Sequence, residues 1–271
     1  MTNSTSLVQS QFGVAAADYA TSDVHARGES LGRIIELAAP QQSWRALDVA
    51  TGAGHMAAAL APRVASIVAS DITGPMLAEA AKLAASRNLT NMTTAKAEAG
   101  ALPFPDESFD LVVCQFGIMF FPDKVQANAE ARRVLRSGGK YIIVIWDRVD
   151  RNVATHVAGR AVAALFPSDV GAFYERIPFR YHDREAIRAD LAAAGFDRIE
   201  IETVELKSRA ASARDAAIGL VQGTPMRSEI EQRDPAMLRV ATDAAAEALK
   251  AMEGPDGFEA PMSAHIVTAT K

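Results

Sequence analysis

The chain has 271 residues, of which 49% are hydrophobic and 23% are charged, so it is long enough to bury a full α/β core. Its net charge of −5 gives no electrostatic reason to bind DNA or RNA, which excludes nucleic acid as an expected partner. The single cysteine, Cys114, excludes an internal disulfide and fits a reducing compartment. There is no signal-peptide pattern and no apolar run of about 20 residues, so we expect a cytoplasmic chain without a membrane span.

The first half of the chain predicts one helix followed by a regular alternation of strands and helices. Apolar residues at helical spacing indicate a helix over residues 14–38, which Pro40 ends. Short apolar runs then indicate strands at 45–49, 66–70, 92–96, 109–115 and 140–146, with helices at 55–61, 75–87 and 124–135. This alternation predicts a parallel, doubly wound sheet whose two faces are both covered by helices. The arginines at the end of the helix over 124–135 are interpreted as part of a solvated helix face; they are Arg132, Arg133 and Arg136.

The second half of the chain breaks this rhythm. A helical stretch within residues 148–182 precedes a helix at 183–194, which Asp183 caps and Gly195 ends. Strands are expected at 199–207 and 264–270, and residues 208–257 are predicted to be mostly helical. We therefore expect an α/β fold with a doubly wound, mostly parallel seven-stranded sheet and a mainly helical cap. The expected division is an N-terminal cap segment at 1–40, a binding core at 41–147, a cap insertion at 148–182, a core helix and strand at 183–207, a helical cap insertion at 208–260 and a last core strand at 261–271.

A glycine turn after the first strand is the clearest sign of a ligand site. Gly52 and Gly54 permit positive φ and close approach of a ligand, and the next helix directs its N–H groups at the turn. The turn matches the loose dinucleotide pattern G-x-G-x-x-A, but the carboxylate of Asp48 would repel a pyrophosphate and suits a cationic group instead. Asp71, at the end of the second strand, can accept hydrogen bonds from ribose hydroxyls, and Glu98 can accept from the amine of adenine.

Five ordered motifs carry a family resemblance. They are Leu47-Asp48-Val-Ala-Thr-Gly52-Ala-Gly54, Asp71 with Met76, Glu98-Ala99, Leu102-Pro-Phe-Pro-Asp106-x-Ser108-Phe109-Asp110 and Arg133-Val-Leu-Arg136-x-Gly138-Gly139. In this order the chain resembles class I S-adenosylmethionine-dependent methyltransferases, and most of all the small-molecule branch (methyltransferase type 11) that includes quinone-biosynthesis C-methyltransferases. The resemblance is strong over residues 10–150. One departure is Ala50, where the family often has a glycine; because alanine is small, we expect this to cost little.

The resemblance implies the cofactor S-adenosyl-L-methionine, with S-adenosyl-L-homocysteine as product, in a Rossmann-like methyltransferase fold. It assigns the methionine amino end to Asp48 and the ribose hydroxyls to Asp71. The other positions that it places at the cofactor are Tyr19, Ala50, Gly52, Gly54, Ile72, Met76, Glu98, Ala99, Gln115 and Phe116. Tyr19 and Phe12, in the N-terminal segment, are expected to close over the cofactor.

The expected reaction is in-line methyl transfer to the oxygen or carbon of a small, largely apolar metabolite. Such a transfer depends mainly on orientation and desolvation, so the catalytic residues stay unknown, with His25, His156 and His182 as weak candidates for a base. His265 is given a structural role, and no metal-ligand spacing is present. The expected oligomeric state is a monomer or a homodimer.

The acceptor pocket is expected to draw on aromatic and methionine side chains outside the strand–helix core, which would otherwise form the core of the cap itself. These are Phe166, Phe173, Tyr174, Phe179, Tyr181, Met226, Met252, Phe258 and Met262. One alternative is an NAD(P)-dependent oxidoreductase, although no Tyr-x-x-x-Lys pair occurs in the chain. The other is a non-catalytic protein that binds S-adenosylmethionine.

Overall fold

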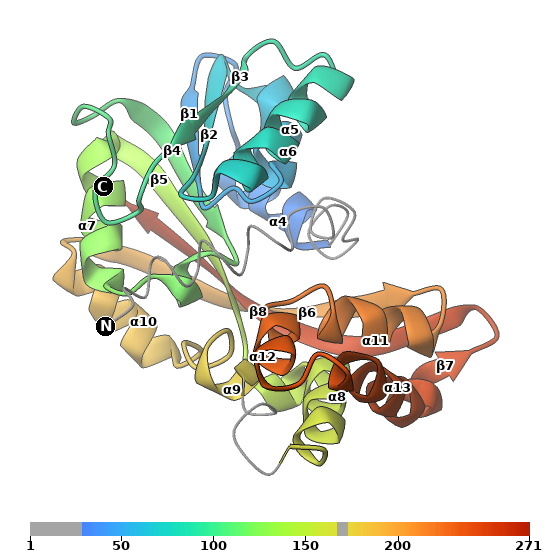
Figure 1. The fold of residues 1–271 in the computed structure, drawn as a ribbon. Helices are drawn as coiled ribbons and strands as arrows, with labels where there is room; N and C mark the ends of the chain where they lie inside the picture. The colour runs from blue at the N-terminus through green and yellow to red at the C-terminus, as the bar shows by residue number, and fades with distance from the viewer. Residues whose placement is uncertain (1–28, 167–172) are drawn as a thin grey trace.

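A twisted central sheet organises the molecule in the computed structural model, which describes residues 29–166 and 173–271 (Figure 1). The strand order is β3-β2-β1-β4-β5-β8-β6, with β7 paired to β8 outside this path. Strands β1 to β5 pair in parallel, whereas β8 is antiparallel to both β5 and β6. The bounds are β1 (Arg45–Val49), β2 (Ser66–Asp71), β3 (Met92–Lys96), β4 (Phe109–Gln115), β5 (Leu135–Trp146), β6 (Arg198–Ala210), β7 (Glu253–Gly254) and β8 (Gly257–Thr270). The predicted doubly wound, mostly parallel sheet is confirmed.

Helices cover both faces of the part of the sheet that holds the parallel strands. On one side lie α4 (Glu29–Ala38), α5 (His55–Leu60) and α6 (Gly74–Ser86), and on the other lie α7 (Lys124–Val134) and α10 (Arg184–Ala193) (Figure 1). Burial on both faces explains why β1 reads as an almost unbroken buried run rather than an alternating one. The prediction of a helix over residues 14–38 can be compared with the structure only from residue 29 onward, where α4 is found.

The cap is built on an extension of two core strands. β6 and β8 stay paired from Arg198 and Thr270 to Ala210 and Phe258, well beyond the edge of the parallel sheet. The cap helices α8 (Val153–Ala163), α9 (Phe173–Arg176), α11 (Ala213–Val221), α12 (Met226–Arg233) and α13 (Met237–Leu249) form a second apolar core with this extension. Short 3-10 turns complete the described elements: η1 (Ala61–Arg63), η2 (Ile118–Phe120), η3 (Val149–Arg151) and η5 (Lys250–Met252).

Three predicted strands are longer by several residues than their sequence patterns indicated, and the first of them, expected at 140–146, begins at Leu135. The strand expected at 199–207 runs to Ala210, and the strand expected at 264–270 begins at Gly257, in a stretch read partly as helical. The physical reason is alternation: Phe258, Ala260 and Met262 are buried in turn, and pairing with β6 overrides the weak strand propensity of this Pro- and Ala-containing stretch.

β6 forms one edge of the sheet, and neighbouring side chains cover its outer backbone. Arg184 and Arg188 of α10 donate to the carbonyl oxygens of Ile201 and Ile199, at 2.7 and 2.6 Å. On the α4 side, Arg33 makes two hydrogen bonds to the carboxylate of Glu202. Within the described ranges, no helix is long and apolar enough to cross a membrane.

Candidate functional site

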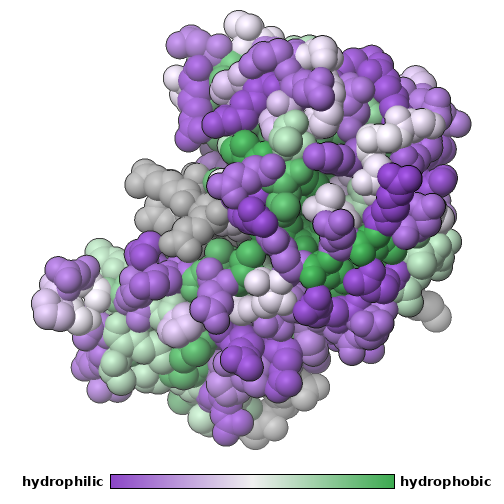
Figure 2. Space-filling model, turned by 180° about the vertical axis from the view of Figure 1, so that it is seen from behind, coloured by the Kyte–Doolittle hydropathy of each residue, from purple (hydrophilic) through white to green (hydrophobic). Residues whose placement is uncertain are grey.

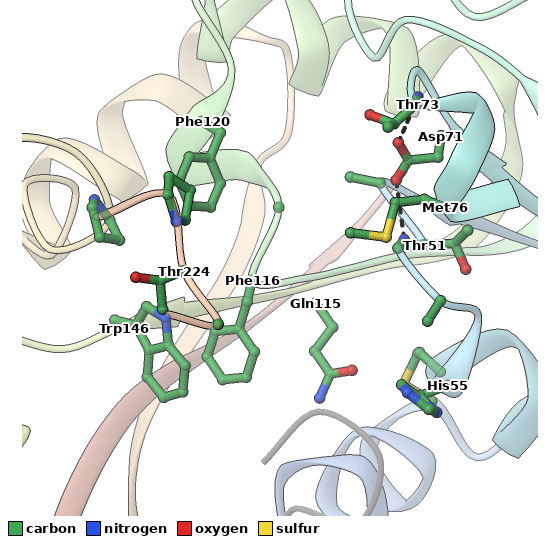
Figure 3. A pocket seen from close by; sticks show the side chains of 18 of the residues that line it. Thr51, His55, Asp71, Thr73, Met76, Gln115, Phe116, Phe120, Trp146 and Thr224 are labelled. Carbon is green, nitrogen blue, oxygen red and sulfur yellow. Dashed lines mark hydrogen bonds between the residues drawn. The ribbon is translucent and has the colours of Figure 1, made fainter. Parts of the chain in front are cut away.

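A cavity of about 870 Å³ opens at the carboxyl ends of β1, β2 and β4 and continues into the cap. This is the edge at which open α/β sheets bind their ligands. Figure 3 shows its two ends: Asp71, Thr73 and Met76 on one side, and Phe120, Trp146 and Thr224 on the other. Seen from behind, apolar side chains also gather in the middle of a largely hydrophilic surface (Figure 2).

Asp48 lies at the end of β1 with 1% of its surface exposed and lines this cavity. Its Oδ2 atom accepts hydrogen bonds from the Thr51 hydroxyl at 2.6 Å and from the Ala57 N–H at 3.0 Å. Its buried Oδ1 atom has no hydrogen-bond partner among the described residues. Burial raises the pKa of this carboxyl to about 7. A buried acceptor without a donor is costly, so this oxygen is suited to a donor that arrives with a ligand.

In the glycine turn between β1 and α5, Gly52 and Gly54 have different roles. Gly52 has φ of +54°, lines the cavity, and has no atom within 4 Å of the place where a Cβ would stand. A Cβ on Gly54, by contrast, would lie 2.8 Å from the Cβ of Ala80 in α6. Gly52 therefore leaves room for a ligand, whereas Gly54 leaves room for close packing of α5 against α6 and is not among the residues that line the cavity.

Ala50 lines the cavity and also adopts a left-handed conformation, with φ of +54°. This conformation costs an L-residue other than glycine roughly 1–2 kcal/mol, so the departure from glycine costs more than the size of alanine suggested. The Cβ of Ala50 is accommodated by Gly117, since a Cβ on Gly117 would lie only 2.6 Å from it. The two residues therefore have complementary sizes.

Asp71 joins the end of β2 to the glycine turn. Its Oδ2 atom accepts from the Gly52 N–H at 3.0 Å and its Oδ1 atom from the Thr73 N–H at 2.8 Å, and burial raises the pKa of the carboxyl above its ordinary value. Each carboxylate oxygen has a second lone pair, so the group can hold the turn and still accept hydroxyl donors from a ligand. Ile72 and Met76 line the cavity beside it.

Glu98 and Ala99 lie on the loop after β3, which also lines the cavity. A backbone bridge between Glu98 and Ala101 shapes this loop. Arg133 supports its continuation, since the guanidinium donates to the carbonyl oxygens of Leu102 and Phe104 at 2.9 and 2.8 Å. The expectation that Arg133 belongs to a solvated helix face is thus wrong: it ties α7 to the loop.

The turn after β4 separates the two ends of the cavity. The Nε2 atom of Gln115 donates to the hydroxyl of the buried Ser30 in α4 at 3.1 Å. Phe116 follows with φ of +54°, a strained conformation for a bulky residue, and stacks on Trp146 with ring centroids 3.7 Å apart. In Figure 3 the side chain of Gln115 lies between the pair Phe116 and Trp146 and the side chain of His55.

The cap supplies the other end of the cavity, and the aromatic and methionine residues expected there divide into three groups. Phe173, Tyr174, Phe179 and Met262 line the cavity. Met226 and Phe258 belong to the apolar core of the cap without lining the cavity, and Phe166 and Met252 pack against that core. Tyr181 packs against the main core, and its hydroxyl donates to Asp190. Trp146, which was assigned only to a strand, is a lining residue that sequence reasoning missed.

Neither of the described histidines that were named as candidate bases lines the cavity. His25, Tyr19 and Phe12 lie outside the described residues. His156 and His182 are not among the residues that line the cavity, and Nδ1 of His182 lies 2.7 Å from the carbonyl oxygen of Phe179. Of the described histidines, it is His55, at the start of α5, that lines the cavity. His265 is buried on the sheet beside Asp147 and Thr203, in an arrangement consistent with a structural role.

Comparison with known proteins identifies the family. Residues 47–143 match a family model described as a methyltransferase domain. The demethylmenaquinone methyltransferase of Thermus thermophilus is 35% identical over 191 residues, which cover 63% of this chain and 83% of that protein. The chain belongs to the S-adenosylmethionine-dependent methyltransferase family. This family membership argues against the alternative that the chain is an NAD(P)-dependent oxidoreductase.

Other similarities of this methyltransferase are partial or structural. The uncharacterized methyltransferase YcgJ of Bacillus subtilis is 35% identical over 144 residues, so the match spans 53% of this chain and 55% of YcgJ. The crystal structure of YcgJ has a TM-score of 0.63 at 23% identity and covers 89% of this chain and 97% of its own. A phosphoethanolamine N-methyltransferase 2 of Haemonchus contortus in complex with S-adenosyl-L-methionine has a TM-score of 0.57 at 20% identity, covering 89% of this chain and 52% of its own. Both structures have the same fold as this chain.

Proposed function

We propose that this protein transfers the methyl group of S-adenosylmethionine to an oxygen or carbon atom of a small, largely apolar metabolite. The observation that carries the proposal is the buried Oδ1 atom of Asp48, which has no donor among the described residues and lies beside a glycine turn open to the cavity. An ammonium group is the kind of donor that such a carboxylate accepts best. Family membership and the continuous cavity support the same conclusion.

The residues present fit the cofactor along its whole length. Asp48 would accept from the methionine ammonium, and Gly52, which has no side chain, would leave space for the methionine backbone. Asp71 would accept from the ribose hydroxyls at the same carboxylate that holds the N–H groups of Gly52 and Thr73. Ile72 and Met76 would pack on adenine, with Glu98 and Ala99 at the edge of its ring.

The cofactor supplies a methyl group already activated on a sulfonium, so the protein mainly binds, orients and excludes water. Gln115 and Phe116 stand where the cofactor end and the cap end of the cavity meet. The rings of Phe116, Trp146 and Phe179 give the acceptor an apolar wall, which keeps water from competing for the methyl group. An acceptor that must lose a proton would need a base, and His55 is the described histidine that lines the cavity.

Calorimetric titration with S-adenosylmethionine and S-adenosylhomocysteine tests the first part of the proposal. We expect both to bind, and the absence of binding at high micromolar concentration contradicts it. Transfer of a labelled methyl group into a fractionated metabolite extract then tests the second part. Binding of both compounds without any labelled product in the extract would favour the non-catalytic alternative.

A further inference from the structure

The orientation of Trp146 is fixed by its neighbours. It ends β5, and its indole ring stacks on Phe116 at 3.7 Å between centroids and 13° between planes. The ring of Phe179 also stacks on the indole, with 6.0 Å between centroids and 24° between planes. The chain after Trp146 is held by Asn152, a buried side chain whose amide donates to the carbonyl oxygens of Asp147, Arg148 and Ser263. The edge that carries the indole N–H is therefore held in one place.

The indole N–H of Trp146 makes no hydrogen bond to any described residue, although Trp146 is half-buried and lines the cavity. In the view of Figure 3 the nitrogen lies on the side of the ring that faces Thr224. A tryptophan N–H normally finds an acceptor when it is removed from water. A bound apolar acceptor molecule would displace water from this part of the cavity, so the molecule itself has to supply the acceptor atom.

Three other donors at the cap end, on Thr224, Tyr174 and Gln222, are already engaged within the protein. The Thr224 hydroxyl donates to the carbonyl oxygen of Leu220 at 2.8 Å, and the Tyr174 hydroxyl donates to the same oxygen. The Gln222 amide donates to the Thr242 hydroxyl at 3.0 Å. These bonds are internal to the cap, which distinguishes them from the N–H of Trp146.

We propose that Trp146 determines acceptor specificity: its indole N–H donates to a carbonyl-type oxygen on an otherwise apolar, aromatic methyl acceptor. This inference rests on the proposed function, because it concerns the acceptor end of the same cavity. A site built to donate one hydrogen bond rejects an analogue without the matching oxygen, since its own donor is then left buried and unpaired. The aromatic wall selects the body of the molecule, and the N–H selects the oxygen.

The test uses two probes that share a hydroxynaphthalene ring and differ in the carbonyl oxygen, 2-acetyl-6-hydroxynaphthalene and 2-ethyl-6-hydroxynaphthalene. Each is titrated by calorimetry into protein saturated with S-adenosylhomocysteine. We expect the ketone to bind the unmodified protein about tenfold more tightly than the alkyl probe, as one hydrogen bond provides. In Trp146→Phe, which keeps a ring but lacks the N–H, the two probes should bind equally. Trp44→Phe is the matched control, because Trp44 packs against the main core away from the lining residues, and it should keep the preference.

A second measurement separates the hydrogen bond from a change in packing. Replacing Trp146 by benzothienylalanine puts sulfur in place of the N–H while keeping the two-ring shape, and it should also abolish the preference. In the Trp44→Phe protein labelled with 15N-tryptophan, the remaining indole proton signal should move downfield with the ketone and not with the alkyl probe. Equal binding of the two probes to the unmodified protein, no binding of either, or a preference that survives both Trp146 replacements would overturn the inference. Failure to bind S-adenosylhomocysteine would instead count against the proposed function.

Discussion

The role of Asp71 leads to a quantitative prediction about cofactor affinity. The substitution Asp71→Asn replaces one carboxylate oxygen by an NH2 group, in a position where both oxygens accept backbone N–H bonds, from Gly52 and Thr73. A hydrogen bond to a charged group is worth about 1.5–3 kcal/mol, and the substitution removes one such acceptor. We therefore expect the Kd of S-adenosylhomocysteine, measured by calorimetry, to rise about 10- to 100-fold.

A ligand without ribose hydroxyls separates two reasons for this loss. If Asp71 acts by accepting from the ribose, Asp71→Asn should weaken binding of the 2′,3′-dideoxy analogue of S-adenosylhomocysteine by a smaller factor than binding of the natural ligand. If the substitution only disturbs the glycine turn, both ligands should lose affinity by the same factor. Equal losses, or a Kd for the natural ligand that stays within threefold, would refute the reasoning.

Three further predictions concern neighbouring residues. Burial holds the pKa of Asp48 near 7 against an ordinary 3.8, so the folded state binds a proton that the unfolded state releases between these values. The unfolding free energy of the ligand-free protein should therefore fall as pH rises from about 4 to 7, and thermal melts of Asp48→Asn should lack this part of the slope. Gly117→Ala should lower the unfolding free energy, measured in urea, by about 1–3 kcal/mol, because the new Cβ would lie 2.6 Å from the Cβ of Ala50. Adding Ala50→Gly should restore part of that stability, and a double variant no more stable than Gly117→Ala would contradict the contact. Asn152→Ala, which leaves buried carbonyl oxygens without their donor, should cost about 2–3 kcal/mol in the same assay, and a cost below 0.5 kcal/mol would exclude the proposed anchoring.

The parallel half of the fold could be predicted from the sequence because its signals are local. β1, β3 and β4 have the predicted bounds, since each is a short run between residues that favour turns. The positions of Asp48 and Asp71 then follow from the rule that strands of a parallel sheet end at one edge. The sequence pattern therefore sufficed to bring these carboxylates to one cavity.

The contacts that shape the cap end are long-range, and no local pattern contains them. The hydrogen bond of Gln115 joins residues 85 positions apart, and the stack of Phe116 on Trp146 depends on how β4 and β5 end. Aromatic composition could not tell Phe173, which lines the cavity, from Phe258, which fills the cap core. That division is set by which face of each element meets the extended pair β6 and β8.

The strained turn at Phe116 could be found only in three dimensions. A phenylalanine is not expected at positive φ, so the residue itself gave no signal. The following Gly117 was one hint, because a glycine next to a strand end marks a tight backbone approach. Its meaning became clear only when the Cβ of Ala50 was found in the space that Gly117 leaves.

The two arginines on the edge of β6 have a consequence for how copies of this protein meet in concentrated solution. An uncovered edge strand of 13 residues offers a row of acceptors to any passing strand, which is the usual first step of aggregation. Arg184 and Arg188 occupy two of those acceptors and add positive charge to the edge. An incoming strand would have to displace both side chains before it could pair with this part of β6, so the two arginines oppose edge-to-edge pairing as charged residues on edge strands do.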